Sequence, residues 1–181
     1  TLLQSVKIFN LEPQNFLPED ILKLKDLGDY KEYSNYKNAI EELTHFKPQV
    51  LIKTFGFHLN DELLRKLADL KVVISSTTGT NHIDLQSCGM RGIEVLSLKG
   101  EVNFLKTITS TAEHTWFLIL SLMRKSRVFS TRVDRGKWDR TDLYCNELSG
   151  KTLGIIGHGR LGEILAKYAR AFQMNLKIFD K

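Results

Sequence analysis

A glycine-rich segment near the end of the chain constrains the fold more than any other feature. Residues 153–162 read Leu-Gly-Ile-Ile-Gly-His-Gly-Arg-Leu-Gly, so an apolar run is followed by glycines spaced G-x-G-x-x-G. A helical pattern comes next, and then the apolar run 176–179 ends in Asp180. This order predicts a buried strand, a glycine turn, a helix, a second strand and an acid, which together form a dinucleotide-binding unit.

Each glycine of this unit has its own expected role. Gly157 allows the tight turn, Gly159 lets the backbone approach a pyrophosphate, and Gly162 lets the helix pack closely on the strand. The helix N-terminus offers unpaired N–H groups and the positive end of its dipole to phosphates. Asp180 follows about 20 residues later, where an acid can bind both ribose hydroxyls. A purely structural glycine turn is the alternative interpretation.

The composition is that of a globular protein, with 42% hydrophobic and 26% charged residues. Apolar runs stay well below the roughly 18 residues that a membrane-spanning helix needs, and no leader segment opens the sequence, so we expect neither a membrane partner nor export. The net charge of +5 comes from dispersed lysines, which argues against nucleic-acid binding. Cys88 and Cys145 fit neither a C-x-x-C pair nor a disulfide framework, and this is typical of free thiols in the cytoplasm.

The first hundred residues alternate between strand-like and helix-like segments. Strands are expected at 6–9, 29–33, 50–54, 72–75 and 93–96. Helices are expected at 18–27, 37–46, from Asn60 or Asp61 through 67, and from Asp84 to Gly92. This alternation predicts an α/β fold with a parallel sheet and helices on both of its faces.

The alternation stops after the fifth expected strand. Residues 97–108 carry charges and scattered apolar side chains and are expected to form a linker or crossover. A long helix is then expected from about Thr109 to Val128. Its middle, 116–120, is apolar all round, which predicts burial on most sides. Residues 136–139 are expected to form a surface loop anchored by Trp138.

Six segments of the sequence carry a family resemblance when they are taken in order. They are 78–84 (TGTNHID), 91–95 (RGIEV), 111–114 (TAEH), 136–138 (GKW), 147–162 (ELSGKTLGIIGHGRLG) and Asp180. In this order they resemble the D-isomer-specific 2-hydroxyacid dehydrogenases, the group that includes D-3-phosphoglycerate, D-lactate and formate dehydrogenases. The match spans roughly residues 50–181.

The resemblance implies two domains and a larger protein. Residues 1–100 would form a flavodoxin-like substrate domain, and residues 101–181 the first part of a Rossmann NAD-binding domain. The resemblance also implies a cleft between domains and a homodimer built partly on the helix from Thr109. A doubly wound half needs more strands than the two found before Lys181, so we expect the chain to be a fragment.

The resemblance also implies where ligands bind. The turn that matches Thr78 and Gly79 holds the substrate carboxylate through backbone amides, as a glycine-containing turn after a strand can; an ordinary strand-to-helix connection is the alternative. Thr78 occupies a position that can touch the cofactor. The expected cofactor-binding set is Thr78, Gly157, His158, Gly159, Arg160, Leu161, Gly162 and Asp180.

Two charged residues bear on the choice of ligand. Lys53 ends an expected strand at the level where such folds bind ligands, so it either steers a substrate anion or is a solvated lysine. Asp180 favours NAD over NADP because a carboxylate would repel a 2′-phosphate. Lys181 weakens this preference slightly by placing a cation next to the acid.

No catalytic residue is expected within the chain. The family's proton donor is a histidine paired with a glutamate, and an arginine binds the substrate carboxylate; all three are expected beyond Lys181. His82 and His114 are interpreted as structural. Glu113 and His114 are not an acid–base pair, because neighbours on a helix point about 100° apart. No metal-spaced cluster or hydrolase motif occurs in the sequence.

The function expected from these residues and from the resemblance is hydride transfer between NAD and a D-2-hydroxy acid or 2-oxo acid. The chain alone is expected to be inactive, since the catalytic histidine, glutamate and arginine are not among its residues. The alternative is an NAD-sensing interaction protein, similar to the related corepressors, because a fold does not fix a function. The sequence does not name the hydroxy acid.

Overall fold

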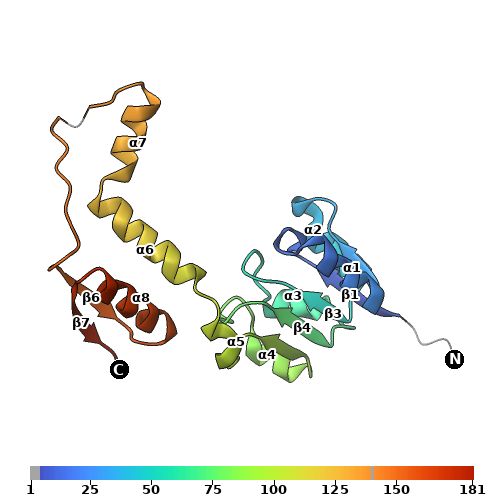
Figure 1. The fold of residues 1–181 in the computed structure, drawn as a ribbon. Coiled ribbons are helices and arrows are strands. Elements are labelled where there is room, and N and C mark those ends of the chain that lie inside the picture. The colour runs from blue at the N-terminus through green and yellow to red at the C-terminus, as the bar shows by residue number, and fades with distance from the viewer. Residues whose placement is uncertain (1–4, 140) are drawn as a thin grey trace. The chain divides into compact units, whose positions relative to one another are not determined.

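The computed structural model describes residues 5–139 and 141–181. The chain divides into two compact units, one that ends at Glu101 and one that begins at Val102. Figure 1 shows the course of the chain through both units, and each is described below by itself.

The first unit is built on a five-stranded parallel sheet, which confirms the expected α/β class. The strands are β1 Val6–Asn10, β2 Gly28–Glu32, β3 Val50–Ile52, β4 Val72–Ser75 and β5 Glu94–Ser97. Their order in the sheet is β2-β1-β3-β4-β5, and all pairs are parallel. All five expected strands are therefore present, each within a few residues of its predicted bounds. Because the strands are parallel, their carboxyl ends lie along one edge of the sheet.

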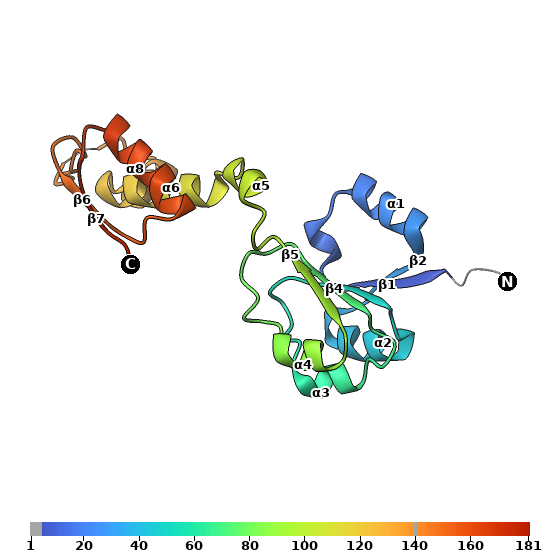
Figure 2. The same cartoon turned by 90° about the horizontal axis from the view of Figure 1, so that it is seen from below.

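Short helices connect these strands. They are α1 Pro18–Leu27, α2 Ala39–Phe46, α3 Asp61–Arg65 and α4 Leu85–Met90, with single turns of 3-10 helix at Pro13–Asn15 and Tyr36–Asn38. Two predicted caps are confirmed: the Asn60 side chain accepts a hydrogen bond from Leu63 N at 3.0 Å, and the Asp84 side chain accepts one from Ser87 N at 2.9 Å. Figure 2 shows α1 on one face of the sheet and α2, α3 and α4 on the other.

The core of the first unit lies between the sheet and the α2–α4 face. Phe9, Leu51 and Val73 point from neighbouring strands into this core and are fully buried. Leu43 of α2 and Leu64 of α3 cover them. The opposite face is thinly covered, since α1 buries none of its residues.

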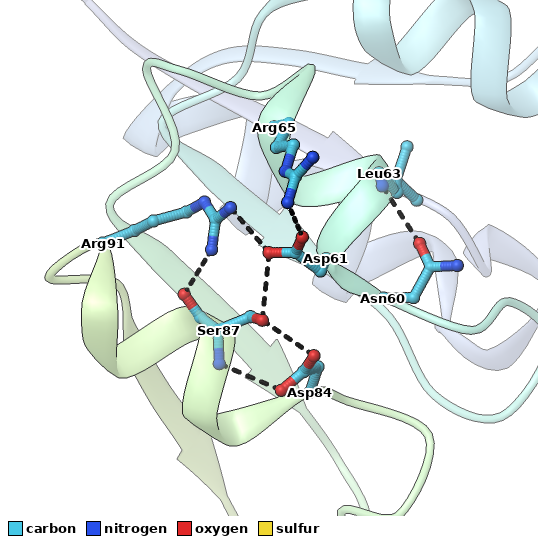
Figure 3. Close-up of polar contacts among 7 residues, drawn as sticks. All are labelled: Asn60, Asp61, Leu63, Arg65, Asp84, Ser87 and Arg91. Carbon is cyan, nitrogen blue, oxygen red and sulfur yellow. Dashed lines mark hydrogen bonds and ion pairs between the residues drawn. The ribbon is translucent and has the colours of Figure 1, made fainter.

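A polar cluster joins α3 to α4 beside this core (Figure 3). The Arg91 guanidinium donates to Asp61 Oδ1 at 2.7 Å and to the Ser87 carbonyl at 2.9 Å. The Ser87 hydroxyl lies within hydrogen-bond distance of both Asp61 and Asp84. The hydrogen bond from Arg91 holds the pKa of Asp61 below its ordinary value, and the backbone hydrogen bond from Ser87 does the same for the pKa of Asp84. This cluster is therefore a structural clamp between two short helices.

The second unit contains a two-stranded parallel sheet with helices packed on it. Its elements are α5 Val102–Lys106, α6 Ser110–Met123, α7 Ser126–Asp134, β6 Thr152–Ile156, α8 Arg160–Ala171 and β7 Asn175–Phe179. The register runs from Thr152 opposite Asn175 to Ile156 opposite Phe179. Trp116 of α6, Leu148 and Ala169 of α8 form the buried centre of this unit.

The expected long helix from Thr109 to Val128 is wrong, because it is broken in two. α6 ends at Met123, Lys125 adopts a left-handed backbone with φ 50°, and α7 begins at Ser126. The carbonyls that end α6 are bound by the returning chain: Asn146 N donates to Met123 O at 3.0 Å, and the Cys145 thiol to Arg124 O at 3.2 Å. This long-range capping explains why the helix stops there.

Two further expectations about this region are also wrong. Burial of the apolar middle of the helix on most sides does not occur within the chain, since Phe117 and Leu118 are exposed. Trp138 does not anchor its loop, because its side chain is 94% exposed. The segment 97–108, expected to be a linker or crossover, contains the division between the two units and the short helix α5. Among the helices of the described residues, none combines the length and apolarity needed to cross a bilayer.

Candidate functional site: a glycine turn and two strand-end loops

The glycine turn of the second unit forms as its sequence predicts. Gly157 has a φ of 91°, a left-handed backbone that favours glycine, and its N–H donates to the Phe179 carbonyl at 2.8 Å. A Cβ on Gly162 would overlap the Gly157 carbonyl oxygen, so only glycine lets α8 start this close to the turn. A Cβ on Gly159 would meet no protein atom within 4 Å. The backbone at Gly159 thus faces open space.

The N-terminus of α8 presents free N–H groups at this turn. Gly159 is the N-cap residue and has no side chain to accept a hydrogen bond. The first intrahelical bond runs from Glu163 N to Gly159 O at 3.0 Å. The N–H groups of Arg160, Leu161 and Gly162 precede it and have no carbonyl in the helix to bind. Such an arrangement can bind an anion.

Asp180 lies at the same turn, one strand away. Its Oδ2 accepts a hydrogen bond from the His158 backbone N–H at 3.0 Å, and its Oδ1 accepts one from Lys181 N at 2.9 Å. The carboxylate is exposed. The structure therefore brings together the glycines, the start of α8 and the acid that the sequence singled out.

Two residues of the expected cofactor set, His158 and Arg160, have half-buried side chains. The Arg160 guanidinium donates to the Leu105 and Ile108 carbonyls at 3.0 and 2.7 Å, so it ties α8 to the connection between α5 and α6. Only the backbone of Arg160 faces the turn. The His158 ring turns inward, and its Nδ1 is buried without a hydrogen-bond partner among the described residues.

The first unit presents a second candidate anion site at the carboxyl edge of its sheet. We call residues 76–82, which follow β4, the β4 turn. Thr78 and Gly79 are exposed at its tip, and their N–H groups have no acceptor within the described residues. Beneath them, Thr77 Oγ1 donates to Gly79 O at 2.8 Å and lies 2.8 Å from Ser75 Oγ. This buried pair of hydroxyls fixes the shape of the turn.

His82 supports the β4 turn from below. Its Nε2 lies 3.2 Å from Ser75 Oγ, and the side chain is buried. Burial lowers the pKa of His82, and the nearby positive charge of Lys53 lowers it further, so the ring is neutral at pH 7. His114, by contrast, is exposed on α6 and lies near the ring of Phe117.

Lys53 begins the neighbouring loop, residues 53–58, which we call the β3 loop. The solvated alternative for this lysine is wrong, because its side chain is fully buried. The ammonium donates to the Phe57 carbonyl and, at 3.2 Å, to the His82 carbonyl. Burial lowers the pKa of Lys53 to about 8, although the negative charge of Glu12 raises it in part. Lys53 thus joins the β3 loop to the β4 turn.

Glu12 is a residue of this edge that the sequence did not single out. It follows β1 and is almost fully buried. Its Oε1 accepts hydrogen bonds from Thr54 N at 3.0 Å and Gly56 N at 2.8 Å, and its Oε2 accepts one from Asn15 Nδ2 at 2.8 Å. Two of its three partners, Thr54 and Gly56, lie 42 and 44 residues away in sequence, so no local pattern indicates them. The described residues contain no cluster of three or more His, Cys, Asp or Glu placed to hold a metal ion.

Comparison with known proteins identifies relatives of this chain. The family described as "D-isomer specific 2-hydroxyacid dehydrogenase, NAD binding domain" matches residues 116–181. The D-3-phosphoglycerate dehydrogenase of Bacillus subtilis is 36% identical over 146 residues, which are 81% of this chain and 26% of that protein. The chain therefore spans only part of the length of this relative.

Solved structures of dehydrogenases and a reductase are also similar to this chain, over most of its length. The D-lactate dehydrogenase of Aquifex aeolicus, complexed with NAD and lactic acid, is 32% identical with a TM-score of 0.77, covering 96% of this chain and 51% of that one. An acyclic imino acid reductase (Bsp5), in complex with NADPH and D-Arg, is 26% identical with a TM-score of 0.75, covering 97% and 56%. Structures of such relatives thus hold either NAD or NADPH. By its sequence and its fold, this chain is related to the D-isomer specific 2-hydroxyacid dehydrogenase family, whose NAD-binding domain it matches over residues 116–181.

Proposed function

We propose that this chain supplies the cofactor-binding turn and part of the substrate site of an NAD-dependent dehydrogenase acting on a D-2-hydroxy acid or its 2-oxo acid. One observation carries the proposal. The Asp180 carboxylate lies 3.0 Å from His158 N, at the glycine turn whose next residue, Gly159, faces open space. A diphosphate bound by that backbone would have the acid beside its adenosine ribose.

The residues of the glycine turn fit such a cofactor. The N–H groups that open α8, at Arg160, Leu161 and Gly162, would bind the diphosphate. The left-handed Gly157 and the crowded Gly162 support the role, since a dinucleotide turn needs glycine at such places. When bound, the nicotinamide supplies the hydride acceptor or donor. The protein's part is to orient it.

The first unit would supply the substrate anion site. In this proposal residues 1–100 form a flavodoxin-like substrate domain, and residues 101–181 form the first part of the Rossmann domain. The free N–H groups of Thr78 and Gly79 would hold the substrate carboxylate, and Thr78 would also touch the cofactor. Lys53 would support this site indirectly. Its ammonium is already bound to the Phe57 and His82 carbonyls, so it holds His82 beneath the β4 turn.

The proton chemistry of the reaction lies outside this chain in our proposal. The histidine, glutamate and arginine that the family resemblance implies have no counterpart among residues 1–181, so the chain alone would be inactive. A cytoplasmic homodimer is part of the same proposal. The exposed apolar side chains of Phe117, Leu118 and Leu122 on α6 support it, as do the free thiols of Cys88 and Cys145.

The test is a fluorescence titration of the full-length protein that contains this chain. We expect NADH to bind more tightly than NADPH. Asp180→Asn should weaken NADH binding about tenfold, because hydrogen bonds to a charged group are worth about 1.5–3 kcal/mol, and it should reduce the preference over NADPH. Asp134→Asn, which makes the same change on α7, is the matched control and should change neither affinity. Equal or reversed affinities of the unmodified protein would contradict the choice of NAD.

A further inference from the structure

The β3 loop and the β4 turn, both at the carboxyl edge of the first unit, differ in whether a carboxylate of the chain binds their N–H groups. β1, β3 and β4 are adjacent in the sheet, so the segments after them lie side by side. The β4 turn has free N–H groups at Thr78 and Gly79. The β3 loop has none to offer at Thr54 and Gly56, because the Glu12 carboxylate accepts both.

Glu12 therefore occupies the place that a bound anion would take at the β3 loop. Its carboxylate is almost fully buried and is held at 2.8–3.0 Å by two backbone N–H groups and by Asn15. Its own backbone N–H donates to Asn10 Oδ1 at 2.9 Å, which fixes the start of the segment. A second anion brought to Thr54 and Gly56 would meet the negative charge of Glu12, which already accepts the N–H groups of both residues.

Lys53 is the only lysine or arginine in the two loops, and it offers no ammonium group at the surface. Its ammonium is fully buried and donates to the carbonyls of Phe57 and His82. The charged groups of Glu12 and Lys53 are thus both used in holding the two loops.

Phe55 gives the free side of the β3 loop an apolar surface. Its side chain is 68% exposed, although it is a large aromatic group. Its ring stands edge-on to the His82 ring, with centroids 5.1 Å apart and planes 60° apart. The exposed ring therefore lies beside the β4 turn. If the β4 turn binds the substrate carboxylate, the substrate side chain would extend toward this ring.

We propose that the substrate taken at this edge is a 2-oxo acid or 2-hydroxy acid with a single negative charge and an uncharged, preferably apolar, side chain. This inference rests on the proposed function, since it takes the β4 turn as the site of the substrate carboxylate. According to this inference, substrates that carry a second carboxylate or a phosphate are not the preferred ligands of this site.

The experiment measures NADH oxidation by the full-length protein with pairs of 2-oxo acids. 2-Oxoglutaramate and 2-oxoglutarate have nearly the same shape and differ by one negative charge; 2-oxo-4-methylpentanoate and 3-phosphohydroxypyruvate extend the comparison. We expect kcat/KM to be at least about tenfold higher for the singly charged member of each pair, mainly through KM. Equal or faster turnover of the more highly charged acid of each pair would overturn the inference alone. If no 2-oxo acid is reduced, the proposed function falls with it.

A charge-neutral variant tests the role of Glu12 directly. Glu12→Gln keeps an oxygen for the N–H groups of Thr54 and Gly56 and removes the negative charge. We expect it to narrow the preference for 2-oxoglutaramate over 2-oxoglutarate by at least about threefold, since less like-charge repulsion remains. Glu41→Gln, an exposed glutamate on α2, is the matched control and should leave the ratio unchanged. The same ratio in Glu12→Gln as in the unmodified protein would contradict the proposed repulsion.

Discussion

The two candidate anion sites of this chain are built in opposite ways. The glycine turn of the second unit is shaped by the backbone, because Gly157 takes a left-handed φ and Gly162 leaves no room for a Cβ. The β4 turn of the first unit is shaped by side chains, through Ser75, Thr77 and His82 beneath it. A backbone-built site depends on glycine at fixed spacing. The β4 turn also depends on a distant segment, since the Lys53 ammonium donates to the His82 carbonyl from 29 residues away.

The largest effect that tests this difference is expected at Gly162. Gly162→Ala would drive a Cβ into the Gly157 carbonyl oxygen, although alanine is the better helix former. We expect a loss of about 3 kcal/mol in the free energy of unfolding, because overpacking against fixed backbone is poorly relieved. NADH binding should be lost with it. Urea unfolding and fluorescence titration measure both.

Gly154→Ala is the matched control for this change. Gly154 lies in β6, and a Cβ there would meet no atom within 4 Å. We expect its unfolding free energy to stay within about 1 kcal/mol of the unmodified protein, with NADH binding retained. Equal losses in the two variants would show that glycine at position 162 has no special steric role.

The next effect concerns the buried lysine of the first unit. Burial lowers the pKa of Lys53 to about 8 from the ordinary 10.5. Between these pH values the unfolded chain binds more protons than the folded one, so the free energy of unfolding should rise with pH across this window. The rise should be at most about 3 kcal/mol, since one pKa unit corresponds to about 1.4 kcal/mol.

Urea unfolding of the unmodified protein and of Lys53→Met at pH values from 7.5 to 10 isolates this contribution. Burial raises the pKa of Tyr30 above its ordinary value, so this residue also makes stability depend on pH, and only the difference between the two curves is informative. That difference should change with pH as Lys53 loses its proton. Parallel curves would mean that the ammonium is as well solvated in the folded protein as in the unfolded one.

The contrast between the sites also explains what could be predicted from the sequence. The five strands, the caps at Asn60 and Asp84, and the glycine turn follow from local patterns, because periodicity, capping and backbone sterics act within a few residues. The break between α6 and α7 does not, since its cause is the return of Cys145 and Asn146 to the helix end. Sequence patterns do not reveal such distant partners.

The candidate site shows the same division. Gly157, Gly162 and Asp180 are found from spacing alone. Glu12 was missed because its partners, Thr54 and Gly56, are 42 and 44 residues away. The sequence also left open whether Lys53 steers an anion or is solvated. Its burial decides against the solvated alternative, and burial depends on how whole segments pack. Apolar periodicity likewise predicts that a helix has an apolar face, but it does not say which segment covers that face. For this reason the burial expected for the middle of α6 is not found in the structure.

The smallest effect distinguishes the clamp between α3 and α4 from an ordinary surface ion pair (Figure 3). Arg91 and Arg65 both bind Asp61, at 2.7 and 2.6 Å. The Arg91 side chain is 27% exposed and also binds the Ser87 carbonyl, whereas the Arg65 side chain is 72% exposed and makes only the ion pair. Arg91→Ala should therefore lower the free energy of unfolding by about 1–2 kcal/mol, and Arg65→Ala by less than about 0.5 kcal/mol.

Thermal unfolding in low and high salt separates the two arginines further. The contribution of Arg65 should fall toward zero at high ionic strength, because exposed pairs are screened by salt. The contribution of Arg91 should persist, since its bond to the Ser87 carbonyl and its partial burial do not depend on a solvated charge pair. If both variants lost the same stability, and lost it only at low salt, the link between α3 and α4 would be a surface effect. The stability of the first unit would then owe little to the polar contacts of Arg91. The contrast with the glycine turn, where stability depends on one fixed residue type, would be larger than proposed.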